Sequence, residues 1–368
     1  MGQDKNVRHA GYDYGLLIPY VCLLLLGLVA VYSASSPIAA YKMGDGNYFL
    51  KRQAMFCLGG VVLMLLVGKI PCTLYAKLVY PMLLASLGLL IALYLPGVGT
   101  RVGGAIRWIR FSDFSFQPSE FAKFPLAVYL AYSMAKKGSE MRTLSRGLFP
   151  HLMVSLCYIA LIYYQPDLGT CVIIGSWVLM CLFVGGVRLR HLLGVFLVFV
   201  PVSAWLVIRE PYRVKRLFAF MNPWEDPQGI GFQIIHSYQA FGSGGILGVG
   251  IGDSKQKLFY LPEPHTDFVL SIVAEEMGLV GVAAVIVLFG VLIARGIRIS
   301  LRAPDLYSSY LAMGLTALIG MQVLVNMGVV MGLLPTKGLT LPLISYGGSS
   351  LIVTSLFVGV LLRISSRS

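Results

Sequence analysis

Long runs of apolar residues, separated by polar breaks, fill most of this chain. A helix that spans a lipid bilayer needs about 20 mostly apolar residues, and a run of that length is its sequence signature. The runs predict ten spanning helices, at about residues 14–33, 54–69, 74–95, 119–134, 149–164, 168–186, 191–208, 267–294, 307–334 and 346–362. The pattern therefore predicts an all-α, polytopic membrane protein that forms a single transmembrane domain over residues 1–368.

Two of the polar breaks are long, at about residues 96–118 and at about 209–265, between the seventh and eighth predicted helices. In the second, we expect an interfacial helix at about 229–242, followed by a glycine-rich stretch, GSGGILGVGIG, at 242–252. Long loops in compact proteins are usually functional or disordered, and the aromatic and glycine content here favours function. The glycines lack a strand–helix context and a GxxxxGK[ST] motif, which argues against nucleotide binding.

Composition agrees with a membrane protein and excludes several other classes. Of the 368 residues, 57% are hydrophobic and only 12% are charged, and the mean hydropathy is +0.79. These values exclude a soluble globular domain, a disordered chain, a disulfide-rich secreted module and a soluble nucleic-acid-binding protein. The six cysteines lie in or beside apolar runs, so we interpret them as small hydrophobic residues without a role in disulfides or metal binding.

The charges are few but strongly unbalanced, with 29 Lys and Arg against 16 Asp and Glu and a formal net charge of +13. Ten spans place both termini on one side of the membrane, which we expect to be the cytoplasm. Basic residues normally concentrate in cytoplasmic loops, yet most of those predicted on the outer side lie in the two long loops. An anionic substrate at the outer face would explain them.

Ionisable side chains inside predicted spans are few, and such residues are costly in a bilayer and often functional. Asp267 lies in LPEPHTDF (261–268), where the second long loop enters a helix. It would either cap that helix or act as a general base at the membrane–water boundary, with His265 beside it. We expect Glu276, further along this helix, to pair with a basic residue, and we leave the role of Glu275 open.

A second polar motif, FQPSEFAK (116–123), begins the fourth predicted helix. Glu120 and Lys123 are three residues apart and can form an ion pair that lets the helix enter the membrane. Alternatively, Lys123 binds a phosphate or a distant carboxylate. Arg107 and Arg110, just before this motif, would either anchor lipid headgroups or hold a pyrophosphate.

A third motif, YQPDLGT (164–170), places Asp167 between two predicted helices. Asp167 is either a turn residue after a proline or the buried partner of a lysine or arginine. Motifs of the HExxH, CxxC and GxSxG types are absent, and the five histidines are scattered along the chain. The sequence therefore predicts no metal site.

Together, the motifs resemble the SEDS family of polytopic membrane proteins. In order, and over nearly the whole chain, they are RWI…FQPSEFAK (107–123), YQPDLGT (164–170), LPEPHTDF (261–268), AEEMGLVG (274–281) and NMGVVMGLLPTKGLTLPLISYGGSS (326–350). The last block resembles the cell-division and sporulation branches of the family more than the elongation branch, and we place the division branch first. Pro264 departs from the family, in which alanine or arginine is commoner at this position.

The resemblance implies a peptidoglycan glycosyltransferase that polymerises lipid II at the outer face of the bacterial cytoplasmic membrane during septal cell-wall synthesis. It maps the essential acid of the family onto Asp267. We expect Asp267 to activate the acceptor hydroxyl as a base and basic side chains to hold the anionic leaving group. The expected substrate-binding residues are Arg107, Arg110, Lys123, Glu120, Asp167, His265 and Lys337, with Arg213 and Arg216 in reserve.

The same resemblance implies no nucleotide cofactor and leaves open a divalent cation such as Mg²⁺. The expected partners are lipid II, a cognate class B penicillin-binding protein with transpeptidase activity, other divisome membrane proteins and membrane lipids, but no nucleic acid. Two alternatives stay open: a lipid II flippase, which buried charges and ten helices also suit, and a membrane scaffold for the transpeptidase. The candidate polar residues gather towards the outer half of the membrane, which favours an interfacial enzyme over a transporter.

Overall fold

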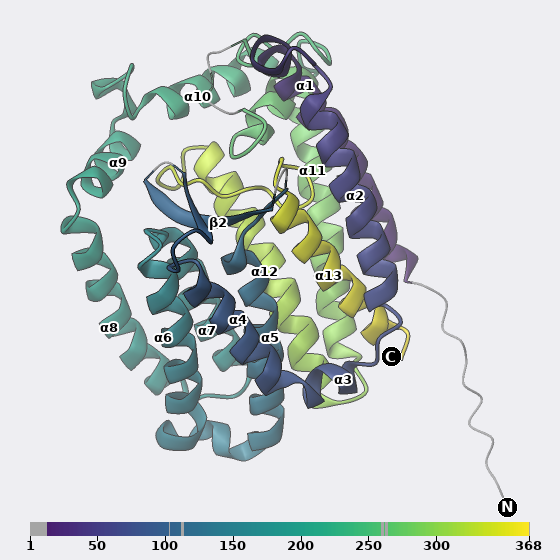
Figure 1. Cartoon of the computed structure of the whole chain (residues 1–368), viewed down its shortest axis with the longest axis vertical. Helices are drawn as coiled ribbons and strands as arrows, with labels where there is room; N and C mark the ends of the chain where they lie inside the picture. Colours follow the sequence, from purple (N-terminus) through teal and green to yellow (C-terminus); the bar gives the residue numbers. More distant parts are fainter. Residues whose placement is uncertain (1–12, 103, 112–113, 259–260, 262–263, 368) are drawn as a thin grey trace, which may run out of the picture.

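Long helices run side by side through this molecule, and a small sheet with two short helices, α9 (Pro211–Met221) and α10 (Phe232–Gly244), covers one end (Figure 1). We call this the outer end. The start of α1 (Tyr14–Met43) and the end of α13 (Gly348–Ser365) lie at the opposite end. The computed structural model describes residues 13–102, 104–111, 114–258, 261 and 264–367.

Every predicted span corresponds to helical structure. The span predicted at 74–95 is split into α3 (Cys72–Lys77) and α4 (Val79–Ala92). Within the described part of the chain, seven helices are long and apolar enough to cross a membrane, and α4 and α7 (Leu168–Val184) are shorter apolar helices. This confirms a mostly helical, multi-pass membrane protein. The remaining helices are α2 (Tyr48–Val67), α5 (Pro118–Lys137), α6 (Phe149–Tyr163), α7 (Leu168–Val184), α8 (Leu189–Ile208), α11 (Val269–Leu301) and α12 (Leu306–Val330).

Helix α5 is polar for a membrane helix because it is surrounded by other helices. Most of its residues are buried, and it packs against α4, α12 and α13. A helix in this position is shielded from lipid, so it can carry the charges of Glu120 and Lys123. By contrast, α8 has only Leu192 buried and forms a flank of the bundle. Two short turns, Gly138–Arg142 and Leu144–Leu148, connect α5 to α6.

A three-stranded antiparallel sheet occupies the first long loop and was not predicted from the sequence. Its strands are β1 (Gly99–Val102), β2 (Ala105–Phe111) and β3 (Phe114–Phe116), in the order β1-β2-β3. Side chains alternate between the two faces of a strand. On β2, Arg107 therefore shares a face with the buried Ala105 and Ile109, whereas Arg110 is exposed on the other face.

The first part of the second long loop, up to Gly244, is largely helical. The interfacial helix predicted at 229–242 is present as α10, but α9 and the short turn Pro223–Glu225 were not predicted. After this loop the chain enters α11, which is interrupted at Gly278 by a non-helical conformation with φ 64° and ψ −160°. Only glycine adopts this conformation readily, so a kink divides α11 into an outer and an inner part.

Candidate active site

Asp267 lies at the outer end of the bundle, in the turn immediately before α11, and it is partly buried. The N-cap position of α11 is occupied by Phe268, the residue after Asp267, and the Phe268 side chain makes no capping hydrogen bond. The Asp267 carboxylate faces the loop between α12 and α13: a β-carbon added to Gly338 would lie 3.0 Å from Asp267 Oδ2.

An asparagine in α12 joins this turn to the same loop. The side-chain amide of Asn326 donates hydrogen bonds to the backbone carbonyls of Asp267, at 3.0 Å, and of Leu339, at 2.5 Å. A role for Asn326 was not predicted from the sequence. The available signal was the pair of polar residues Gln322 and Asn326, which are one helical turn apart inside an apolar run and so share a face.

Lys337 extends from this loop to the start of α7. Its Nζ atom is buried and has no hydrogen-bond partner among the described residues. The side chain passes over the backbone of Gly169, where an added β-carbon would lie 1.4 Å from Lys337 Cε. Burial and, to a lesser extent, the positive charge of Lys123 lower the pKa of Lys337 to about 8, while the negative charge of Asp167 acts in the opposite direction. Such an unpartnered ammonium group is ready to receive an anion.

Asp167 is the N-cap residue of α7. Its carboxylate accepts hydrogen bonds from the backbone N–H of Thr170, at 3.2 Å, and from the Thr170 hydroxyl, at 2.8 Å. A carboxylate at a helix N-terminus is stabilised by the helix dipole. Asp167 therefore serves as a cap, as the turn pattern allowed, and is also close enough to Lys337 to affect its charge.

Glu120 and Lys123 form the ion pair that their spacing predicted, with Lys123 Nζ 2.5 Å from Glu120 Oε1. The Lys123 side chain is only 1% exposed. The Gln322 amide of α12 lies 3.5 Å from the second oxygen of Glu120. Both charges of this pair affect the pKa of Lys337, so the pair lies near the loop that carries Lys337.

The two predicted arginines of β2 occupy different environments. Arg107 donates hydrogen bonds to the backbone carbonyls of Gln165, at 3.1 Å, and of Pro166. It therefore holds the turn that leads to Asp167. Arg110 is exposed, and the main chain at this position pairs with Ser115 of β3.

His265 is buried beside the Asp267 turn. Its ring packs against Phe49, with ring centroids 4.4 Å apart, and against Tyr346, at 5.5 Å. Its backbone carbonyl accepts a hydrogen bond of 2.8 Å from the Tyr346 N–H. Burial lowers the pKa of His265 to about 4, so the ring is neutral near pH 7 and fixes the position of the turn by packing.

The side chains of the two glutamates of α11 bind the segment that follows the glycine-rich stretch of the second long loop. Glu276 forms a buried ion pair with Lys257, at 2.9 Å, and accepts a hydrogen bond of 2.6 Å from Ser33. The expectation that Glu276 pairs with a basic residue is confirmed. Glu275 accepts hydrogen bonds from the Ser254 hydroxyl and from the backbone N–H of Lys255. Both carboxylates are thus occupied by contacts within the chain.

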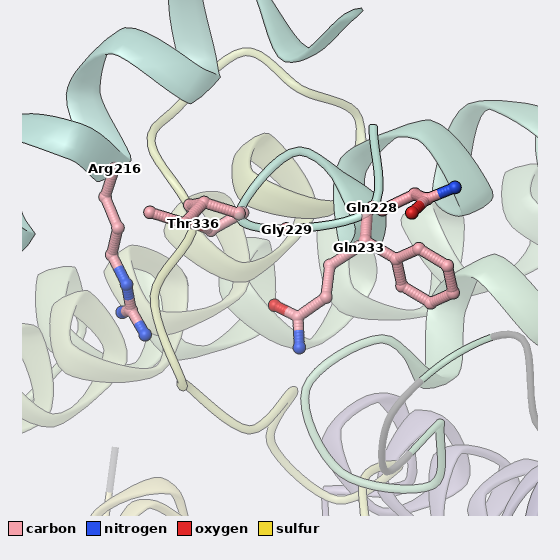
Figure 2. A pocket seen from close by; sticks show the side chains of 7 residues that line it. Arg216, Gln228, Gly229, Gln233 and Thr336 are labelled. Atoms are coloured by element: carbon pink, nitrogen blue, oxygen red, sulfur yellow. The ribbon is translucent and has the colours of Figure 1, made fainter. Parts of the chain in front are cut away.

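A cavity of about 340 Å³ is lined in part by Thr336, the residue before Lys337. Figure 2 shows Arg216 of α9 and Gln233 of α10 on either side of the loop segment that carries Thr336. Thr336 precedes Lys337, and Gly338, which lies against Asp267, follows it. In this loop, Thr336 lines the cavity, Lys337 carries the buried ammonium group, and Gly338 lies close to the Asp267 carboxylate.

Similarity to known proteins agrees with this arrangement. The FtsW/RodA/SpoVE family of cell cycle proteins matches residues 15–368. The chain is 47% identical, over 97% of its length and 95% of the relative, to a Geobacter metallireducens protein named "Probable peptidoglycan glycosyltransferase FtsW". It is 43% identical to the stage V sporulation protein E of Bacillus subtilis, over 97% of each chain.

Solved structures show the same fold. A chain from a study of the "structural coordination of polymerization and crosslinking by a peptidoglycan synthase complex" is 33% identical, with a TM-score of 0.79 over 97% of this chain and 98% of that one. The rod-shape-determining protein RodA of Thermus thermophilus is 31% identical, with a TM-score of 0.71 over 97% of each chain. The family resemblance predicted from the motifs is confirmed: this chain is a member of the FtsW/RodA/SpoVE family of cell cycle proteins.

Proposed function

We propose that this chain is a peptidoglycan glycosyltransferase that polymerises lipid II into glycan strands at the outer face of the cytoplasmic membrane, in septal cell-wall synthesis. The named relatives support the reaction class and the division role. One observation carries the proposal for the site: Lys337, whose buried ammonium group lacks a partner among the described residues, is adjacent in the chain to the glycine that contacts the Asp267 carboxylate.

In the proposed reaction, Asp267 accepts the proton of the acceptor sugar's 4-hydroxyl group. The hydroxyl oxygen forms a bond to the anomeric carbon of the donor, the bond from that carbon to the pyrophosphate oxygen breaks, and the lipid pyrophosphate leaves with the electron pair. A base within hydrogen-bond reach of the hydroxyl accelerates such a transfer. The Asn326 hydrogen bond to the Asp267 carbonyl supports this role, because it fixes the turn that carries the carboxylate.

The leaving group is anionic, so it needs positive charge where it departs. We assign this role to Lys337, with Arg216 on the adjoining cavity. Glu120, Lys123 and Asp167 set the charge around Lys337, and Arg107 holds the Asp167 turn. Arg110 is assigned to the water-side part of the substrate, and His265 to positioning of the Asp267 turn.

A divalent cation that accompanies the pyrophosphate is compatible with this proposal. Groups of three His, Cys, Asp or Glu side chains suited to a metal ion are absent from the residues that the structure describes. The proposed reaction uses no nucleotide cofactor, as the family resemblance implies, and Lys337 supplies positive charge to the leaving group directly.

We further propose that the chain works with a class B penicillin-binding protein, because a chain of similar fold comes from a peptidoglycan synthase complex of polymerisation and crosslinking. Other divisome membrane proteins and membrane lipids complete the expected partners. The proposed topology places the outer end in the periplasm or its equivalent and both termini in the cytoplasm. The Asp13–Arg295 contact, at 3.9 Å, places the start of α1 at the same end of the bundle as the inner part of α11.

The test uses the full-length protein, purified with its cognate transpeptidase and supplied with lipid II. We expect the wild-type complex to form glycan strands and D267N to form none. D253N, a substitution of an exposed aspartate in the same outer region, is the matched control and should retain activity. Strand formation by D267N would overturn the base assignment. Translocation of lipid II without strand formation by the wild type would favour the flippase alternative.

A further inference from the structure

The glycine-rich loop at residues 245–251 is seated directly on the kink of α11. The backbone N–H groups of Val249 and Gly250 donate to the carbonyls of Glu275 and Glu276, at 2.9 and 3.1 Å. Gly278 interrupts the helix, so these carbonyls are available to the loop. In return, the backbone N–H groups of Leu279 and Val280 donate to the carbonyls of Gly245 and Ile246, at 3.0 and 3.2 Å.

Glycine is required where the loop and the kink meet. A β-carbon on Gly248, whose φ is +82°, would lie 2.1 Å from the carbonyl oxygen of Glu276. A β-carbon on Gly278 would lie 2.4 Å from the backbone nitrogen of Gly248. The two backbones can therefore approach closely enough to satisfy each other's polar groups. Non-helical backbone is tolerated at membrane depth only when its polar groups are satisfied within the protein.

The side chains of this loop are apolar and point away from the protein. Leu247 is 80% exposed, Ile246 69% and Ile251 64%. They continue an exposed apolar face of α11, which begins at Leu279 and Val280 and extends to Val287 and Val291. Val280, Val287 and Val291 are spaced seven and four residues apart, so they lie on one helical face. The loop therefore extends a surface that faces lipid along the spanning helix.

Helix length places this loop at the edge of the hydrocarbon layer. Residues 279–294 of α11, between the kink and Arg295, rise roughly 24 Å at about 1.5 Å per residue, somewhat less than the hydrocarbon thickness of about 30 Å. Gly278 therefore lies near the outer hydrocarbon boundary, and the outer part of α11 projects into the headgroup region. Polar residues return immediately beyond the apolar segment, with exposed Asp253 and Lys255.

We propose that loop 245–251 is a membrane anchor whose apolar side chains insert among the lipid acyl chains at the outer boundary. Because it is bonded to α11, and α11 begins two residues after Asp267, the anchor fixes the height of the Asp267 carboxylate above the bilayer. A lipid-linked substrate presents its pyrophosphate and sugars at a set height, so this distance matters for the reaction. The height-setting role rests on the proposed function, whereas the insertion does not.

Insertion is tested by site-directed spin labelling in vesicles of phosphatidylethanolamine and phosphatidylglycerol, in a variant whose six native cysteines are replaced. The label is placed in turn at L247C, at D253C as the water-exposed control just after the loop, and at V287C as the lipid-facing control. We expect the label at 247, like that at 287, to collide with oxygen in preference to a water-soluble nickel complex, and the label at 253 to show the reverse. Nickel accessibility at 247, or shielding from both reagents by a protein neighbour, would overturn the proposal.

Height setting is tested with L247D and L247A, assayed for glycan synthesis in vesicles and in detergent. A charge near the interface opposes insertion modestly, so we expect L247D to lose roughly fivefold in vesicles and little in detergent, with L247A in between. Equal activity of L247D and the wild type in vesicles would contradict height setting, even if the label at 247 lies in lipid. Absence of polymerisation by the wild-type protein would instead count against the proposed function.

Discussion

The side chain of Lys337 lies on the backbone of Gly169, in the space that a β-carbon on that glycine would occupy. These residues come from the loop after α12 and from the first turn of α7. Because Gly169 has no side chain, the long side chain of Lys337 can come near Asp167. The Asp167 carboxylate offsets part of the pKa decrease that burial causes in Lys337. A residue with no chemistry of its own therefore determines where the buried positive charge lies.

We expect G169A to displace Lys337 and to lower glycan synthesis towards the level of K337M, a loss of roughly 10²-fold if Lys337 stabilises the leaving group. Alanine favours helix over glycine, so the variant should unfold no earlier than the wild type. The measurement is polymerisation of lipid II together with thermal unfolding in detergent. G194A in α8 is the control, because an added β-carbon there meets no atom within 4 Å. Full activity of G169A would argue against a catalytic contribution of Lys337.

Gly338 offers an equivalent test of Asp267. A β-carbon at this position would lie 3.0 Å from Asp267 Oδ2, a separation at which the carboxylate must move by a few tenths of an ångström. We expect G338A to reduce kcat more than it raises KM, because small displacements of a base impair proton transfer. At Gly347, near the end of the same loop, the three atoms nearest to an added β-carbon all belong to Thr340, so G347A should change kcat little. Equal kcat values for both variants would remove Gly338 from the site.

The proposed role of Lys337 also predicts a pH dependence. A lysine is cationic below its pKa, and burial lowers the pKa of Lys337 to about 8. Activity that depends on the charged form should therefore decline as the pH rises through about 8. We expect this decline in kcat/KM, which reports the free enzyme. In K337R the charge persists to much higher pH, so any remaining activity should not show this decline; the same alkaline limb in K337R would assign the titration to another group.

The sequence predicts the helices well because the bilayer imposes a simple requirement on each one. It does not predict the sheet, since β2 is only seven residues long and its sequence, AIRWIRF, does not alternate between apolar and polar residues. The kink at Gly278 was also missed, because its cause is a distant loop whose backbone bonds to it. Local patterns carry no information on such contacts.

The candidate site was predictable to a similar extent. The motifs identified Glu120, Lys123 and Asp167, and the spacing predicted the ion pair between the first two, which the structure confirms. The contact between Lys337 and Gly169 joins residues far apart in the chain, so it required the fold. The roles of these residues in catalysis and substrate binding stay predictions, and for Arg107 the structure adds a second role, its bonds to the turn before Asp167.

The buried Glu120–Lys123 pair predicts an asymmetric effect on stability. K123M removes the only cation bonded to Glu120 among the described contacts and leaves a carboxylate buried without its partner. Breaking a buried ion pair in this way costs about 3–5 kcal/mol of the free energy of unfolding. The double variant E120Q/K123M removes both charges and should recover much of this loss, because the neutral amide needs less compensation than a charge. Thermal unfolding of the purified variants in detergent measures both effects. If the double variant is no more stable than K123M, then packing of the lysine side chain, and not its charge, supports α5.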